Sequence, residues 1–352
     1  MVDTSPNLNA RQVRSHMPKS AYDSRVHIGL PLFLALFSLY LGLWLAALSV
    51  QALWLKFLLG IVTGQAIGSL FVVGHDASHE SLTGRPLLDR TLAILAFLPS
   101  LHPVCTWEIE HNKMHHAWTN LKGSDLVYAP MTPQEFDALS PFQKRLHRFY
   151  RSFGGFGCFY LFDIWLPVLI LRRSKYCKNI PTHLLINDFF WVGLFLAMQI
   201  GMCFVFAATL SQAMWNILLC VILPFIVWNY VMAFITIQNH THPSIKWFDD
   251  REEWCFYHAQ VQGSVHTELP RWLDFAFIRV FHHTAHHIDQ KIPVYRLKNA
   301  QSTMEDTFKD DVKVILFNLS EFRKILYDCQ LYDYRNHQWL RFPKADQAVP
   351  AE

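Results

Sequence analysis

The sequence predicts an all-α integral membrane protein, with four transmembrane helices arranged as two hairpins and a helical cap on the cytoplasmic side. Two observations of composition support this prediction: 52% of the 352 residues are apolar, and only 17% are charged. Soluble domains carry about 25% charged residues, so the deficit indicates a surface that faces lipid. The net charge of +3 is too small to indicate a nucleic-acid partner.

Four apolar stretches are long enough to cross a hydrocarbon core of about 30 Å. They lie at residues 28–47, 53–74, 189–209 and 214–237. Lys56 lies near the start of the second stretch, where its side chain can reach the interface, and Pro224 can kink the fourth stretch without ending it. Two shorter or interrupted apolar runs, 92–104 and 154–171, are predicted to be interfacial or re-entrant helices.

Basic residues predict the orientation in the membrane. Lys and Arg occur in the N-terminal segment, in the long loop 75–187 and after His240, whereas the hairpin tips near 48–52 and 210–213 carry none. The positive-inside rule therefore places both termini and the long loop in the cytoplasm. We expect three parts: a cytoplasmic segment at 1–27, a membrane domain at 28–300 and a cytoplasmic tail at 301–352.

Histidine is unusually frequent, with 19 residues, and much of it falls in three clusters on the predicted cytoplasmic side. The clusters are H-D-A-S-H (His75, His79), H-N-K-M-H-H (His111, His115, His116) and H-T-A-H-H (His283, His286, His287). Residues three or four apart share one face of an α-helix, so His75/His79, His111/His115 and the third cluster each direct two imidazoles to a common point. The second histidine of each doublet lies about 100° round the helix and can reach a second metal ion.

The number of imidazoles indicates more than one metal ion. Eight exceed the three or four ligands that one zinc ion needs, and nitrogen-rich ligation with space for dioxygen suits two iron ions. The seven cysteines are widely spread and contain no C-x-x-C pair, so they offer no cysteine-based zinc site. A fourth motif, Q-N-H-T-H-P at 238–243, brings His240 and His242 to the end of the fourth predicted span.

These motifs resemble the signature of the membrane fatty acid desaturase superfamily: H-x(3,4)-H followed by two H-x(2,3)-H-H motifs around two transmembrane hairpins. The Q-N-H-T-H-P segment is similar to the Q-H-T-H-P segment of acyl-chain desaturases, and the resemblance covers roughly residues 30–300. It implies that nine histidines ligate two iron ions: His75, His79, His111, His115, His116, His240, His283, His286 and His287. His242 is the alternative to His240, and His282 the alternative to His283.

The resemblance implies an oxygen-dependent fatty acyl desaturase that introduces a C=C bond, with two iron ions as cofactor, O2 as co-substrate and membrane lipid around it. No H-P-G-G haem motif is present, so we expect a separate electron donor, a ferredoxin or a b-type cytochrome with its reductase. A hydroxylase, an acetylenase or an oxidative decarboxylase that forms a terminal alkene is the alternative. A non-enzymatic metal or haem carrier is disfavoured because the predicted spans hold almost no ionisable residues. Without a fused cytochrome or an obvious C-terminal retrieval signal, a bacterial inner membrane is the expected location.

Residues beside the clusters have expected supporting roles. A carboxylate commonly accepts a hydrogen bond from the second ring nitrogen of a ligating histidine, and we expect this of Asp125 and Glu110 in particular. The other candidates are Asp76, Glu80, Glu108 and Asp289. Trp107 and Trp118 are expected to anchor at the membrane interface, with the lining of an acyl channel as the alternative role. His266 stays unassigned, and no metal role is expected for His16, His27, His102, His147, His183, His258 and His337.

Overall fold

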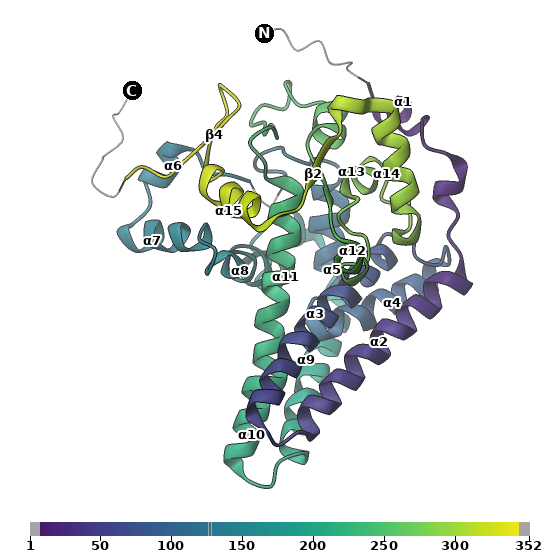
Figure 1. The fold of residues 1–352 in the computed structure, drawn as a ribbon, viewed down its shortest axis with the longest axis vertical. Helices are drawn as coiled ribbons and strands as arrows, with labels where there is room; N and C mark the ends of the chain where they lie inside the picture. Colours follow the sequence, from purple (N-terminus) through teal and green to yellow (C-terminus); the bar gives the residue numbers. More distant parts are fainter. Residues whose placement is uncertain (1–7, 126, 128, 345–352) are drawn as a thin grey trace.

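Long helices form a narrow base below a broader cap in the computed structural model, which describes residues 8–125, 127 and 129–344 (Figure 1). The base consists of α2 (Val26–Ser49), α3 (Leu53–Ser78), α9 (Thr182–Val205) and the run of α10 (Leu210–Ile217), η6 (Leu218–Ile222) and α11 (Leu223–His240). Among the described residues, these four helical segments are long and apolar enough to cross a membrane unbent. The four predicted spans are thus confirmed as apolar helices.

The observed helix bounds differ from the predicted ones where polar residues continue a helix into the cap. The second helix extends beyond residue 74 to Ser78 and carries the first histidine cluster in its last turns. The third begins at Thr182 rather than near 189, because its polar first turns are held by the protein. There the buried carboxylate of Asp188 accepts a hydrogen bond from the backbone N–H of Cys105 at 2.7 Å.

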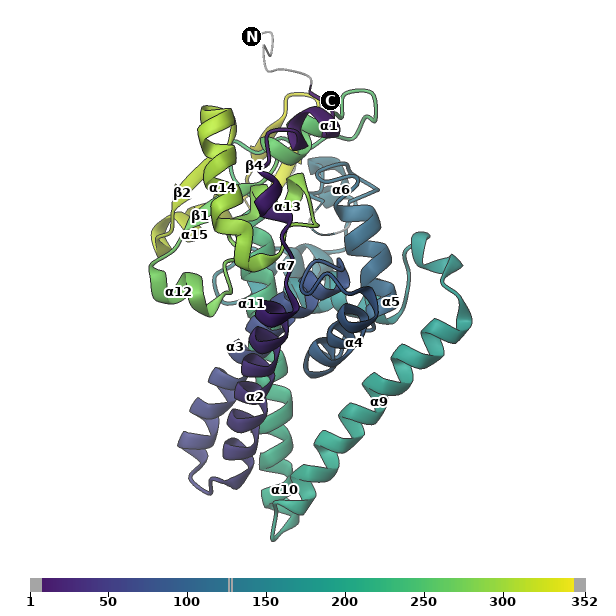
Figure 2. The same cartoon turned by 90° about the vertical axis from the view of Figure 1, so that its right-hand side faces the viewer.

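Glycines allow α3 to approach α11 closely. Gly60, Gly64 and Gly68 recur at every fourth position of α3 on the face that meets η6 and α11. A Cβ added at Gly64 would lie 2.5 Å from the Cβ of Val227, and one at Gly68 would lie 2.6 Å from Cγ1 of Val231. Small residues at this spacing let two membrane helices approach closely. In contrast, α9 slants away from the other long helices (Figure 2).

The two weaker apolar runs do not form straight spans. The first becomes α4 (Pro86–Phe97) and η2 (Leu98–Ser100), which bend by 103° into α5 (Val104–Trp107) and η3 (Glu108–His115). Leu101 adopts a left-handed conformation at this bend, with φ of 55°. The second run forms the short helix of α8 (Phe156–Phe159) and η4 (Tyr160–Ile170). The bent pair has the shape of a broken span or of a re-entrant segment, and the second run is shorter than the four long helices.

The cap holds the remaining elements and all four described strands. Its helices are α1 (Ala10–Arg14), η1 (Lys19–Tyr22), α6 (Pro133–Asp137), α7 (Pro141–Tyr150), η5 (Tyr176–Asn179), η7 (Tyr257–Val261), α12 (Arg271–Ala276), α13 (His283–Ile288), α14 (Val294–Phe308), η8 (Lys309–Asp311) and α15 (Leu319–Asp328). Strand β1 (Val265–Glu268) pairs in parallel with β2 (Lys313–Leu316), and β3 (Leu331–Asp333) pairs antiparallel with β4 (Gln338–Leu340). Helix α14 runs through residue 300, where we expected the membrane domain to end and the tail to begin. The residues on both sides of this boundary therefore belong to one helix.

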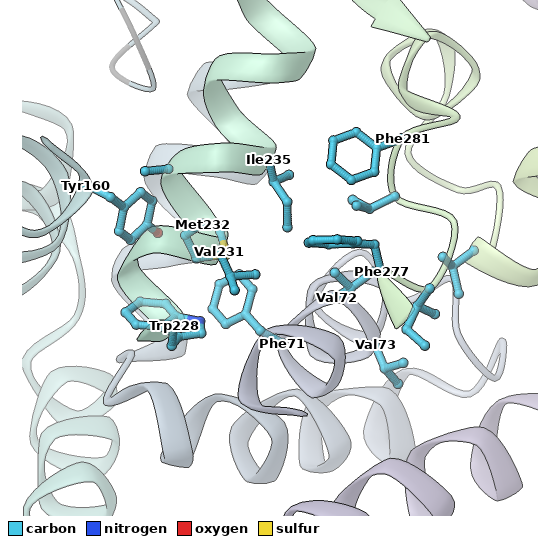
Figure 3. Packing of buried hydrophobic residues seen from close by; sticks show 14 of the residues in the cluster. Phe71, Val72, Val73, Tyr160, Trp228, Val231, Met232, Ile235, Phe277 and Phe281 are labelled. Atoms are coloured by element: carbon cyan, nitrogen blue, oxygen red, sulfur yellow. The ribbon is translucent and has the colours of Figure 1, made fainter. Parts of the chain in front are cut away.

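An aromatic core joins the cap to the base. Figure 3 shows Trp228 and Met232 of α11 beside Phe71 of α3, with Tyr160 of η4 on one side and Phe281 on the other. Trp228 and Phe71 are fully buried, and their ring centroids lie 5.7 Å apart. This core fixes the upper ends of α3 and α11, from which histidines of the first and fourth motifs project.

Candidate metal centre

The structure brings the nine predicted histidines together in two groups, all of them buried. The five-histidine group consists of His75, His79, His111, His116 and His286. The four-histidine group consists of His115, His240, His283 and His287. Within each group the candidate ligand atoms all lie within 4.8 Å of one another. Residues from the base and from distant parts of the cap therefore converge on two points.

The pairing of the second histidine cluster differs from the prediction. Segment η3 is a π-helix, in which the N–H of His116 donates to the carbonyl of His111 at 3.2 Å. Residues five apart therefore share a face, so His111 and His116 join one group while His115 joins the other. The predicted pairing of His111 with His115 at a common point is wrong, because it assumed α-helical spacing. In α-helical α13, by contrast, His283 and His287 form an ordinary i,i+4 pair.

Short contacts between Nε2 atoms link the rings inside each group. In the five-histidine group they are 2.8 Å (His75–His111), 3.3 Å (His75–His79), 3.2 Å (His111–His116) and 3.1 Å (His116–His286). In the four-histidine group they are 3.2 Å (His115–His287), 2.8 Å (His240–His283) and 3.0 Å (His283–His287). Imidazole nitrogens about 2.1 Å from one metal ion and at right angles to each other lie about 3.0 Å apart. The donor set therefore fits one metal ion in each group.

The protonation state of the rings also fits metal binding. Burial and the neighbouring imidazoles hold the pKa of His79, His116 and His287 well below the ordinary value for histidine. These rings are therefore neutral, which is the form that ligates a metal ion. Neutral rings whose Nε2 atoms face one another cannot all donate hydrogen bonds, whereas a cation between them satisfies every lone pair.

Among the described residues, Nδ1 of two of the nine rings forms a hydrogen bond with a polar side chain, and Nδ1 of His75 lies 3.6 Å from the carboxylate of Asp76. Nδ1 of His115 donates to Asp125 at 2.9 Å, as expected for that carboxylate. Nδ1 of His287 donates to Oε1 of Gln260 at 3.0 Å, and the amide nitrogen of Gln260 donates to the carbonyl of His116 at 2.8 Å. Sequence reasoning missed Gln260, which lies in η7 outside any of the histidine motifs. In both cases Nε2 is left free to face the group.

Glu110 and Trp107 do not occupy their expected positions. Glu110 accepts a hydrogen bond from the thiol of Cys177 at 2.9 Å and contacts no histidine nitrogen among the described hydrogen bonds. Trp107 is buried, stacks on His111 with ring centroids 4.2 Å apart and lines the cavity beside the histidines, so it does not anchor at a lipid interface. The indole of Trp118 packs against Trp254 and lies 4.2 Å from the guanidinium of Arg251.

The alternative ligands lie outside both groups. His242 forms a local hydrogen bond with Ser244 at 2.7 Å. His282 faces Asp274 at 3.5 Å and packs against His266 with ring centroids 4.6 Å apart. His266 in turn pairs with Glu305, so the residue that the sequence left unassigned belongs to a structural network in the cap.

The other candidate carboxylates join parts of the cap to each other. Asp76 accepts a hydrogen bond from the first backbone N–H of α14, at Val294, and its Oδ1 lies 3.6 Å from Nδ1 of His75, in line with its expected role beside a histidine. The remaining pairs are Glu80 with Lys291, Glu108 with Arg90, and Asp289 with Arg14. These contacts hold the cap segments around the histidines and do not involve the Nε2 atoms of the two groups.

A mostly apolar cavity lies beside the two groups. Five of the histidines form one part of its wall, and apolar side chains of α3, η4 and α11, such as Phe71, Ile164 and Met232, form most of the rest. Asn239 is fully buried in the wall, and neither its amide nitrogen nor its oxygen has a partner in the described part of the chain. An alkyl chain fits such walls because its transfer from water to an apolar surface is favourable.

A hydrogen bond inside the protein fixes the Tyr160 side of this wall. Nδ1 of His102 donates to the carbonyl of Ser100 at 3.0 Å, so its Nε2 accepts from the hydroxyl of Tyr160 at 3.1 Å. Burial lowers the pKa of His102 to about 3, so this ring stays neutral. The arrangement places a mostly apolar cavity next to two candidate metal sites.

Comparison with known proteins agrees with this geometry. The sequence pattern of the family described as fatty acid desaturase matches residues 52–317, from α3 to β2. An sn-1 oleoyl-lipid 12-desaturase of Picosynechococcus sp. is 26% identical over 97% of this chain and 95% of its own length. A chloroplastic omega-6 fatty acid desaturase of Glycine max is 26% identical over 94% of this chain and 74% of its own. All nine histidines lie inside the matched region, and the chain belongs to the fatty acid desaturase family.

Proposed function

We propose that this enzyme, a fatty acyl desaturase, acts on an acyl chain attached to a membrane lipid, with one iron ion in each histidine group. The observation that carries the proposal is the convergence of nine buried imidazoles in two groups, five of which line an apolar cavity. Relatives named oleoyl-lipid 12-desaturases support an oleoyl group as the substrate and carbon 12 as the site of the new double bond.

The bound iron ions would supply, with dioxygen and two electrons, the oxidising power to remove two hydrogens from adjacent carbons. The protein determines which carbons react, because only methylenes held beside the histidine groups are in reach. Phe71 and Met232 form part of the wall along which the chain lies, while Tyr160 is fixed by His102. Trp107 covers His111 and excludes water from that side of the centre.

The nine ligands in this proposal are the histidines of the two groups, with His240 rather than His242 as the ninth. Two features support His240: it is buried at the end of α11, and its Nε2 lies 2.8 Å from that of His283. Asp125 and Gln260 orient His115 and His287 by accepting from their Nδ1 atoms. Such partners fix the ring and the tautomer of a ligating histidine.

We further propose that α2–α3 and α9–α11 cross the membrane as two hairpins, with the cap and both flanking segments, 1–27 and 301–352, in the cytoplasm. The distribution of Lys and Arg supports this orientation. The electron donor is then a cytoplasmic ferredoxin or b-type cytochrome with its reductase, and the location is a bacterial inner membrane.

Product analysis tests the function. The chain is expressed in a bacterial host that makes oleoyl lipids but no diunsaturated ones, and the positions of double bonds are determined by mass spectrometry of derivatised acyl esters. We expect a second double bond at carbon 12, lost in His79→Ala and retained in His242→Ala. A hydroxylated acyl chain, a terminal alkene one carbon shorter, or unchanged lipids in iron-replete cells would overturn the proposal.

A further inference from the structure

The helix α12 carries an exposed aromatic surface. None of its six residues is buried, and Trp272 and Phe275 are 71% and 72% exposed. Leu316 of β2 is 69% exposed and pairs with Glu268 of β1. Glu268 precedes the first residue of α12 by three positions in the chain. We call Trp272 and Phe275 the α12 surface. Large apolar side chains grouped on a protein surface usually mark a site that contacts another molecule or a membrane.

The end of α12 contacts a candidate membrane span well below the cap end of that span. The hydroxyl of Ser69 in α3 donates to the carbonyl of Ala276 at 2.6 Å, and the amide of Gln65 donates to the same carbonyl at 3.4 Å. With a rise of 1.5 Å per residue, Ser69 lies about 14 Å along α3 from its last residue, Ser78. Figures 1 and 2 accordingly show α12 at the lower margin of the cap, where the long helices enter it.

The α12 surface continues an apolar stripe of α3. Trp54, Leu58, Ile61 and Val62 are exposed and follow one another at helical spacing, so they form one face of α3. Gln65 is the next residue on that face, and it is hydrogen-bonded to the end of α12. Helix α12 therefore lies where the exposed apolar stripe of α3 ends. If α3 crosses the membrane, the end of this stripe is at the level of the membrane interface.

We propose that α12 is a membrane-docking helix whose Trp272 and Phe275 insert into the interfacial region of the lipid bilayer around the base. The composition of α12 suits this position, because tryptophan is favoured at membrane interfaces and the exposed Arg271 can reach lipid headgroups. The inference rests on the proposed membrane crossing of the base and does not depend on iron or on the substrate.

A short turn links α12 to the cavity. Ile278 and Arg279 both have positive φ, 50° and 61°, which is unfavourable for a β-branched residue. The N–H of Arg279 donates to the carbonyl of Asp274 at 2.9 Å and so ties this turn to α12. Val280, the next residue, lies in the cavity wall. Docking of α12 on the bilayer therefore also holds Val280 of the cavity wall close to the membrane surface.

Site-directed spin labelling tests the proposal. The full chain carrying Phe275→Cys or Trp272→Cys is labelled with a nitroxide and reconstituted into vesicles of phosphatidylcholine and phosphatidylglycerol. The collision rates of the label with lipid-soluble oxygen and with a water-soluble nickel chelate are then compared by electron paramagnetic resonance. Val62→Cys on the exposed stripe and Ser302→Cys on the exposed face of α14 are the matched controls, and the labelled unsubstituted chain gives the background.

We expect labels at 272 and 275 to collide mainly with oxygen, as the label at 62 does, while the label at 302 collides mainly with nickel. If position 62 is in lipid but 272 and 275 are accessible to nickel, the docking helix is refuted while the membrane crossing stands. If position 62 is itself in water, the proposed crossing of the base fails with it. Labels at 272 and 275 shielded from both reagents, with spin–spin coupling that grows with protein density, would identify a protein interface and also refute the proposal.

Discussion

Asp125 accepts a hydrogen bond from Nδ1 of His115 at 2.9 Å, and both side chains are buried. Burial alone would raise the pKa of this carboxyl, but the His115 imidazole and the backbone N–H of Val127 outweigh it, so the pKa lies below its ordinary value. The backbone N–H of Asn120 also donates to Asp125, at 2.8 Å. A charged carboxylate thus holds the ring of His115 with Nε2 directed at the four-histidine group.

This contact predicts the effect of Asp125→Asn. The amide can still accept from His115, but it lacks the charge that increases the basicity of the ring, so the metal affinity of the four-histidine group should fall about 10- to 100-fold. Iron retained by the purified protein against increasing chelator measures this loss. Glu110→Gln is the control, since Glu110 bonds to Cys177, and it should release iron as the unsubstituted chain does. Equal iron retention in Asp125→Asn and the unsubstituted chain would show that the carboxylate has no such role.

Replacement of Gln260 should make the folded protein less stable. In Gln260→Leu the carbonyl of His116 loses its donor, and a buried polar group without a partner destabilises a protein by about 1–3 kcal/mol. His287 keeps one neighbour, Thr119 at 3.2 Å, so the iron site should be weakened and not abolished. Chemical denaturation in detergent measures the free energy of unfolding. Gln260→Glu, which keeps the acceptor for His287, should retain more iron than Gln260→Leu, and the reverse order would contradict this account.

Replacement of Tyr160 should change which acyl chains the enzyme accepts. Tyr160→Ala removes a large part of the cavity wall, so the enzyme should accept acyl chains that differ more in length and shift the position of desaturation. Tyr160→Phe keeps the ring and loses only the hydrogen bond to His102, so the product pattern should stay the same. Product profiles from a set of acyl chain lengths compare the two variants. An unchanged product profile in an active Tyr160→Ala variant would show that the acyl chain does not lie against Tyr160.

The close approach of α3 and α11 predicts a difference between two glycines. In Gly64→Ala the new Cβ would lie 2.5 Å from the Cβ of Val227, and overpacking of this kind destabilises by about 1–3 kcal/mol. In Gly42→Ala the new Cβ meets nothing within 4 Å, so higher helix propensity should leave the protein as stable or slightly more so. Melting temperatures in detergent test the pair. Similar temperatures for both variants would show that the two helices pack less closely.

Hydropathy and histidine spacing predicted the four long helices and the residues that form the two groups. Hydropathy is informative because helix surfaces that face lipid must be apolar over the whole span. Hydropathy located the start of α9 incorrectly because the first turns of this helix are polar. The buried Asp188 accepts a hydrogen bond from the backbone N–H of Cys105, and only the folded chain shows that contact.

The arrangement of the ligands was predicted less well than their identity. The spacing of His111, His115 and His116 is compatible with an α-helix and with a π-helix, and the two place different pairs on one face. The role of Gln260 depends on a long-range contact with His287, and Trp107 is covered by neighbouring chain. Local sequence carries no signal for either position.

The iron content of the purified protein tests the central claim most directly. Because the histidines form two groups, the unsubstituted chain should hold two iron ions. His79→Ala in one group and His240→Ala in the other should each hold about one. His242→Ala should keep both, since His242 bonds to Ser244 outside the groups. A single metal ion in the unsubstituted chain would contradict the two-ion centre, and loss of iron in His242→Ala with retention in His240→Ala would contradict His240 as a ligand.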